Sequence, residues 1–230
     1  MEEKKHLPEE KQEDKQKHEE ESQEITEEPD PWYRGPIKIV LSLFLLLLIV
    51  MWTFSYYGGK IDPEPTRIPS KAEALPIDII LDNDTILIVT KNDFYKAIKP
   101  EDPVIKQTAD RIASISCDGN RVCQAKAIYY FIRDNYDYIS DPVNKEYIED
   151  PKEFLKIGGA DCESGTLALA SLLEAIGIQA ELVFIPGHAL LRINLPEASK
   201  RYKINDYVYL DWTCSNCNFG EIPLNVRKEI

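Results

Sequence analysis

An uninterrupted apolar run near the N-terminus constrains how the whole chain can be organised. Residues 37–57 read IKIVLSLFLLLLIVMWTFSYY, and the only charge among them is that of Lys38. A helix needs about 20 apolar residues to cross the hydrocarbon core of a bilayer. Tryptophan and tyrosine flank the run on both sides, as in the aromatic belts of membrane helices. The run is longer than the core of a signal peptide and carries no small-residue cleavage site, so we expect one transmembrane helix over 37–57.

The segment before this helix is strongly acidic. Residues 1–31 contain 13 Asp and Glu residues against 5 Lys, in a chain whose formal net charge is -13. With so few aliphatic side chains the segment cannot bury enough apolar surface to offset the ordering of its backbone, and we expect a disordered acidic tail over 1–36. Phosphate binding needs a basic field, which this chain lacks, so nucleic acid is excluded as a partner.

The residues after the apolar run are rich in glycine and proline. Two glycines and four prolines between Gly58 and Pro76 predict an extended linker over 58–76, which leaves 77–230 as one compact domain. Seven Lys and Arg residues lie between the N-terminus and Lys38, and this favours a cytoplasmic tail. We therefore expect a single-pass protein of the cell membrane, with the lipid bilayer as one partner and the domain outside the cell.

Periodicity within 77–230 predicts helices followed by strands. The pattern IDIILDNDTILIV over 77–89 is typical of a hairpin. Helical spacing predicts helices at 103–116, 123–136 and 151–155, and another that starts at Asp161 or Cys162 and ends at Gly177. Strand-like runs follow at 179–185, 189–194 and 207–212. This order is an α+β arrangement with a helix on one face of an antiparallel sheet.

Cysteine and histidine usage indicates where chemistry could reside. Four of the five cysteines form two close pairs in the sequence, whereas Cys162 stands alone. His188 is the only histidine outside the charged tail. Cys162 falls in the first turn of its predicted helix, where free amides and the helix dipole favour an anion, so we expect its thiol pKa to be lowered. Its backbone N–H would also face a reacting carbonyl as an oxyanion donor.

Two further residues complete a possible catalytic group. His188 follows Pro186-Gly187 and opens a strand, so its ring would sit at the end of a sheet. Asp211 lies in YVYLDWT between apolar neighbours, and a carboxylate embedded in that way needs a partner to offset its burial. An imidazole on an adjacent strand would provide that partner. The pattern predicts a nucleophile, a base and an orienting carboxylate in Cys162, His188 and Asp211.

These motifs carry a family resemblance. Gly-Ala-Asp-Cys162 at a helix start, Ala-Ile-Gly-Ile before a strand, His188-Ala189 opening the next strand and Asp211-Trp212-Thr213 after a third resemble the transglutaminase-like cysteine-protease superfamily. The resemblance covers about 126–223 and implies a papain-like core with its nucleophile helix packed on an antiparallel sheet. It also implies a Cys-His-Asp triad that acts on a peptide or protein substrate and needs no cofactor. The membrane-anchored arrangement is similar to that of uncharacterised archaeal members.

The chain departs from the pattern of that superfamily at three positions. Leu190 and Trp212 stand where the family often has an aromatic residue and a proline, and Glu163 stands where animal transglutaminases have a tryptophan. These departures favour a hydrolase or general acyltransferase of amide bonds over protein crosslinking. The alternative is a non-catalytic peptide-binding or scaffolding module on the same fold.

The paired cysteines admit two structural roles. Cys117 with Cys123 and Cys214 with Cys217 could form disulfides, in local or crossed connectivity. The same four thiols could instead hold a structural zinc ion, as the C-x-x-C spacing of the second pair suggests. We favour disulfides, because the domain is expected outside the cell.

Overall fold

The computed structural model describes residues 34–81, 90–142 and 147–230, and it divides the chain into units 1–53 and 54–230. In the first unit, helix α2 begins at Arg34, and it extends to Ile61. Within the described ranges one stretch, Gly35–Phe54, is long and apolar enough to cross a membrane, with a mean hydropathy of 2.5. Its large apolar side chains are exposed along the whole stretch, as expected for a helix whose solvent is lipid.

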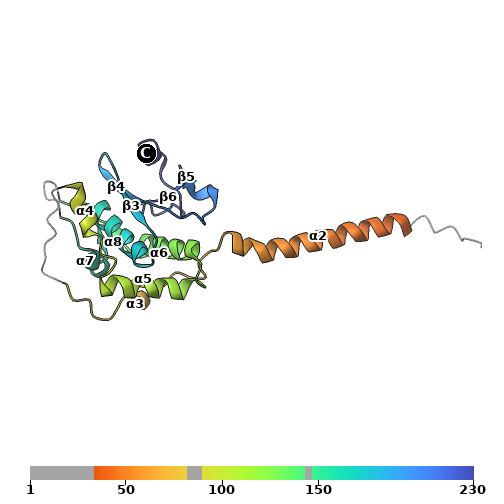
Figure 1. Cartoon of the computed structure of the whole chain (residues 1–230), viewed down its shortest axis with the longest axis horizontal. Helices are drawn as coiled ribbons and strands as arrows, with labels where there is room; N and C mark the ends of the chain where they lie inside the picture. The colour runs from red at the N-terminus through yellow and green to blue at the C-terminus, as the bar shows by residue number, and fades with distance from the viewer. Residues whose placement is uncertain (1–33, 82–89, 143–146) are drawn as a thin grey trace, which may run out of the picture. The chain divides into compact units, whose positions relative to one another are not determined.

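The second unit has the predicted α+β architecture (Figure 1). The helices are α3 (Lys71–Ala74), α4 (Lys91–Ala97), α5 (Pro103–Ser116), α6 (Arg121–Asn135), α7 (Pro151–Ile157), α8 (Cys162–Ala175) and α9 (Leu224–Arg227). The strands are β1 (Asp137–Tyr138), β2 (Gly159–Ala160), β3 (Ala180–Ile185), β4 (His188–Ile193), β5 (Lys203–Ile204) and β6 (Tyr207–Leu210), and a short 3-10 helix, η2, covers Lys200–Tyr202.

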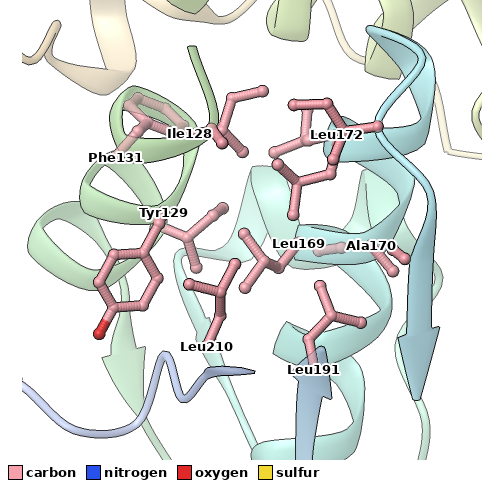
Figure 2. Packing of buried hydrophobic residues seen from close by; sticks show 14 of the residues in the cluster. Ile128, Tyr129, Phe131, Leu169, Ala170, Leu172, Leu191 and Leu210 are labelled. Carbon is pink, nitrogen blue, oxygen red and sulfur yellow. The ribbon is translucent and has the colours of Figure 1, made fainter. Parts of the chain in front are cut away.

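Helix α8 is the centre of this unit. Among its residues only Glu163 and Glu174 escape full burial, because α5, α6 and α7 pack on it from one side and β3 and β4 from the other. Figure 2 shows Leu169 of α8 between Ile128 of α6 and the strand residues Leu191 and Leu210. A helix that is apolar on all sides must be enclosed in this way, so its N-terminus is held firmly against the sheet.

The main sheet has the strand order β3-β4-β6-β5 and is antiparallel throughout. Leu191 of β4 pairs with Leu210 of β6, so the start of β4 and the residue after β6 lie at the same end of neighbouring strands. A separate parallel pair joins β1 to β2, which immediately precedes α8. Both pairings bring distant parts of the sequence to the N-terminus of α8.

Sequence periodicity located most elements, and three differences stand out. The hairpin predicted over 77–89 is not formed in its first half, since 77–81 are not in a strand, and 82–89 lie outside the described residues. Helix α4 was not predicted, although Thr90 and Asp93 form a capping box that marks its start. The predicted helix at 123–136 begins earlier, at Arg121, because the Asn120 side chain caps the amides of Val122 and Cys123.

A buried lysine ties the predicted linker to the domain. The Lys126 side chain is fully buried, and its Nζ lies 2.6 Å from both Asp62 Oδ1 and Glu64 Oε1. Asp62 also accepts a hydrogen bond from the Tyr202 hydroxyl at 2.7 Å. Residues 62–64 are therefore held against α6 and η2 by charge pairing.

The four paired cysteines form two local disulfides. Cys117 is bonded to Cys123, and Cys214 is bonded to Cys217. The preference for disulfides is thus confirmed and the crossed connectivity is wrong. Because each sulfur is already paired with its neighbour in the sequence, the four thiols are not available together as ligands of one zinc ion.

Candidate functional site

Cys162 is the first residue of α8, as the sequence predicted. The side chain of Asp161 caps the helix by accepting a hydrogen bond from the Ser164 amide at 3.0 Å. Gly158 ends the preceding helix α7 in the left-handed region, with φ 98°, which a residue with a Cβ adopts only with strain. The turn between the two helices therefore delivers Cys162 to the edge of the sheet, where it is 6% exposed.

The thiol of Cys162 has two neighbours that fix its position. Its sulfur donates a hydrogen bond to Glu163 Oε2 at 3.0 Å. The backbone N–H of Ala189, the residue after His188, points at the same sulfur. Cys162 therefore lies beside the start of β4, although within the described residues its hydrogen bond goes to Glu163 rather than to the His188 ring.

The expectation that the Cys162 thiol ionises readily is wrong for this arrangement. Burial, the hydrogen bond to Glu163 and the charge of that carboxylate together raise the pKa of Cys162 to about 12, although the amide of Ala189 opposes the shift. The helix N-terminus does favour a thiolate, but the burial of the sulfur and the adjacent Glu163 carboxylate outweigh that effect. In this state the residue is a neutral thiol.

His188 and Asp211 form the most direct contact in the site. His188 Nε2 lies 3.0 Å from Asp211 Oδ2, across neighbouring strands. The other carboxylate oxygen of Asp211 accepts hydrogen bonds from the Thr213 amide at 3.1 Å and the Thr213 hydroxyl at 2.7 Å. Asp211 is 1% exposed, so this network supplies the partners that a buried carboxylate requires.

The contact with Asp211 also sets the protonation of the imidazole. The hydrogen bond to the Asp211 carboxylate raises the pKa of His188 above its usual value, and this outweighs the opposing effect of burial. Because Nε2 is engaged by Asp211, Nδ1 is the ring nitrogen left to exchange a proton with another group. The arrangement can thus hold an imidazole in one orientation and stabilise its charged form.

Trp212 was identified in the sequence as part of a motif, but its contact with Cys162 was not predicted. Its indole Nε1 donates a hydrogen bond to the carbonyl oxygen of Cys162 at 3.2 Å, and the ring is 2% exposed. A Cβ added to Gly165 would lie 2.1 Å from the Trp212 ring, so only glycine leaves room for it. The glycine inside an otherwise strong helix was the available signal, since glycine is disfavoured there without a packing reason.

Tyr129 of α6 contacts the turn that follows Asp211. Its hydroxyl lies at the edge of the core cluster in Figure 2, 3.2 Å from the carbonyl oxygens of Asp211 and Cys217. Arg133, one turn further along α6, donates a hydrogen bond to the Cys217 carbonyl at 2.6 Å. These bonds hold the turn between Asp211 and the Cys214–Cys217 disulfide.

A surface cleft opens next to the His188–Asp211 pair. Its walls come from β1, the β3–β4 turn and the C-terminal helix α9. The residues that line it are Tyr138, Ile185, Pro186, Gly187, His188, Asp211, Thr213, Pro223, Asn225, Val226 and Glu229. A ligand in this cleft would therefore meet the imidazole directly, while Cys162 lies outside this set of lining residues.

The fold and the site define an α+β domain that presents a cysteine at a helix start beside a strand-borne histidine. Residues 106–194 match the family model of the transglutaminase-like superfamily, so this part of the chain is similar to that superfamily. The matched range includes Cys162 and His188 and ends before Asp211. No curated protein and no solved structure matches the chain.

Proposed function

We propose that the domain is a cysteine-dependent hydrolase or acyltransferase of peptide or amide bonds, with Cys162 as nucleophile, His188 as general base and Asp211 as the carboxylate that orients the imidazole. The observation that carries the proposal is the 3.0 Å contact between His188 and Asp211. The residue after His188, Ala189, directs its backbone N–H at the Cys162 sulfur, so this pair lies next to the thiol. The match of the surrounding residues to the transglutaminase-like superfamily supports the same chemistry.

The chemical steps follow from the roles of the three residues. The Cys162 thiol gives its proton to His188 and its sulfur attacks the carbonyl carbon of an amide, with the Cys162 backbone N–H as one donor to the oxyanion. The C–N bond breaks as the leaving amine takes the proton from His188, and a thioester remains on Cys162. Water then attacks the thioester, loses a proton to the imidazole and releases a carboxylic acid and the free thiol. An amine in place of water would give transfer instead of hydrolysis.

Glu163 and Trp212 favour hydrolysis as the principal outcome. Glu163 occupies the position next to the nucleophile, and Trp212 is buried against Cys162 and Gly165 rather than lining an open channel. Neither residue supplies an apolar passage to the sulfur for a second protein side chain. Water is the smaller acceptor and needs no such passage.

Helix α2 would hold the enzyme at the cell membrane. The apolar stretch Gly35–Phe54 supports a single span, and the two disulfides support an oxidising exterior for the domain. In this arrangement the acidic tail is cytoplasmic and the domain acts on substrates outside the cell. Protease added to intact cells should remove the domain and spare a tag on the N-terminus; loss of the tag instead would reverse the orientation.

Alkylation of the full-length protein in detergent micelles tests the catalytic pair. Under non-reducing conditions Cys162 is the one free cysteine, so iodoacetamide reports on it alone. His188→Asn should slow the reaction near neutral pH about tenfold, because the thiol loses its proton acceptor. The same substitution in the tail, His18→Asn, is the matched control. Equal rates for the wild type and His188→Asn would rule out the pair.

A binding module without turnover is the second candidate, and one observation favours it. The raised pKa of Cys162 and its hydrogen bond to Glu163 describe an unreactive thiol. The cleft beside His188 would then bind peptides without cleaving them. An electrophilic activity-based probe separates the two: labelling that disappears in Cys162→Ala supports the enzyme, and absence of labelling in the wild type supports the module.

A further inference from the structure

Glu163 stands between Cys162 and two other ionisable side chains at the start of α8. Its Oε2 accepts the hydrogen bond of the Cys162 thiol at 3.0 Å. Its carboxyl group is also hydrogen-bonded to that of Asp161, and it lies within electrostatic reach of the His188 ring. A side chain that would otherwise extend into solvent from the first turn of a helix is thus folded back onto the nucleophile.

The contact between the two carboxyl groups requires a shared proton, because two carboxylates at hydrogen-bond distance only repel each other. Burial and the hydrogen bond to Glu163 raise the pKa of Asp161 to about 7. Burial acts against ionisation of Glu163 as well, but the hydrogen bonds from Asp161 and Cys162 lower its pKa. The proton therefore resides on Asp161, and Glu163 is a carboxylate that accepts from both neighbours.

We propose that Glu163 is a positioning residue that holds the hydrogen of the Cys162 thiol in the resting state and must release it before His188 can take it. This inference rests on the proposed function. A thiol has one hydrogen and donates it to one acceptor at a time, so the Glu163 carboxylate and the imidazole compete for it. Loss of the Asp161 proton leaves two adjacent carboxylates that repel each other, and Glu163 then swings away from the sulfur.

The ionisable groups that face Glu163 come from three elements. Asp161 caps α8 and Cys162 is its first residue, His188 opens β4, and Tyr138 of β1 lies within electrostatic reach of Cys162, Asp161 and Glu163. Burial raises the pKa of Tyr138, and the three acidic groups add to that shift, so it stays neutral near pH 7. Asp161 and His188 are consequently the groups whose charge changes in the range where release is expected, and the Asp161→Asn variant isolates the contribution of Asp161.

Alkylation with iodoacetamide across a pH series of about 5.5 to 9 tests the proposal on the full-length, unreduced protein in detergent micelles. Glu163→Gln should react about tenfold faster than the wild type near pH 6, since a neutral amide no longer disfavours the thiolate. Glu174→Gln, the same substitution at the other end of α8, is the matched control and should react like the wild type. Far-UV circular dichroism verifies that both variants are folded.

Asp161→Asn gives an independent test that does not depend on Glu163→Gln being folded. An asparagine keeps a hydrogen-bond donor toward Glu163 at every pH and still caps the helix. Below its pKa any thiol is alkylated about tenfold faster per pH unit, because the thiolate fraction grows. The wild-type rate should therefore rise more steeply than this through about pH 7 as Asp161 ionises, and Asp161→Asn should keep only the tenfold slope. Glu163→Gln behaving as the wild type, or Asp161→Asn retaining the steeper rise, would overturn the assignment.

The His188→Asn variant separates this proposal from the proposed function. If Glu163→Gln is alkylated faster and His188→Asn is alkylated at the wild-type rate, Glu163 holds the thiol hydrogen but His188 is not its base. If His188→Asn is alkylated more slowly and Glu163→Gln is alkylated at the wild-type rate, His188 is the base but Glu163 does not hold the thiol hydrogen.

Discussion

The indole of Trp212 donates its hydrogen bond to the carbonyl oxygen of Cys162, and the distance of 3.2 Å joins the residue after Asp211 to the first residue of α8. The ring reaches this position by filling the space beside Gly165, where it also packs edge-on against Phe154. The strand end that precedes Asp211 and the helix that begins at Cys162 are therefore fixed to each other by one buried side chain.

Gly165→Ala should destabilise the domain by about 1–3 kcal/mol, the usual range for overpacking a core. The added Cβ would lie 2.1 Å from the indole, so either the helix or the ring must move. Urea unfolding followed by circular dichroism measures the loss. Trp212→Phe shortens the ring, so the double variant should lose less stability than the sum of the two single changes. Additive losses would show that the two residues do not meet.

The charge of His188 should make stability depend on pH. Its pKa is raised in the folded state by Asp211, so the stabilisation from the charged ring is fully present below its ordinary value and is lost as pH rises through the raised value. The difference in unfolding free energy between the wild type and His188→Asn should therefore shrink as pH rises from about 6 to 9. Chemical unfolding at several pH values measures it, with His18→Asn as the control. A difference that grows with pH would contradict the assigned direction.

The two disulfides should contribute equally to stability but differently to the site. Each closes a short loop, and replacing either pair by serine should cost about 2 kcal/mol in the unfolding free energy. Only loss of Cys214–Cys217 should also change the alkylation rate of Cys162, because the amide of Cys214 donates a hydrogen bond to the carbonyl oxygen of Asp211. Loss of Cys117–Cys123 serves as its matched control. Zinc bound stoichiometrically to the purified protein would contradict the disulfide assignment.

Tyr129→Phe isolates the hydrogen bonds beneath the Asp211 turn. The ring stays in the core, but the carbonyl oxygens of Asp211 and Cys217 lose their shared donor, so the unfolding free energy should fall by about 1 kcal/mol. Tyr95→Phe removes a hydroxyl from a half-exposed ring and should have no measurable effect. Thermal unfolding of both variants makes the comparison. Equal stability of the two would mean that the Tyr129 hydroxyl does not support the turn.

Local signals in the sequence were sufficient for most of the fold. Capping residues, turn glycines and apolar runs act within a few residues of one another. These local signals predict that α8 starts at Cys162 and that a strand begins at His188. The pairing of His188 with Asp211 could also be expected, because a buried carboxylate and a lone imidazole on neighbouring strands need each other. These inferences needed no knowledge of side-chain packing.

Other features depend on contacts that no local pattern encodes. The pKa of Cys162 was predicted from the helix dipole, but the burial of the sulfur and the direction of the Glu163 side chain decide it. Trp212 packs against Gly165, which is far away in the sequence. A glycine within a helix indicates close packing, but it does not predict which residue packs there. The first half of the predicted hairpin is not a strand, because alternation of apolar residues is also compatible with an extended segment outside a sheet.

The ion pairs of Lys126 determine where the protein can be cut. A soluble fragment that begins at residue 77 would keep this buried ammonium and lose both carboxylates that neutralise it, since they come from Asp62 and Glu64. Leaving a buried charge without its partner costs about 3–5 kcal/mol, which is a large part of the stability of a domain this size. The smallest self-sufficient folding unit therefore includes the residues that follow α2, and a stable soluble fragment would have to begin on the N-terminal side of Asp62.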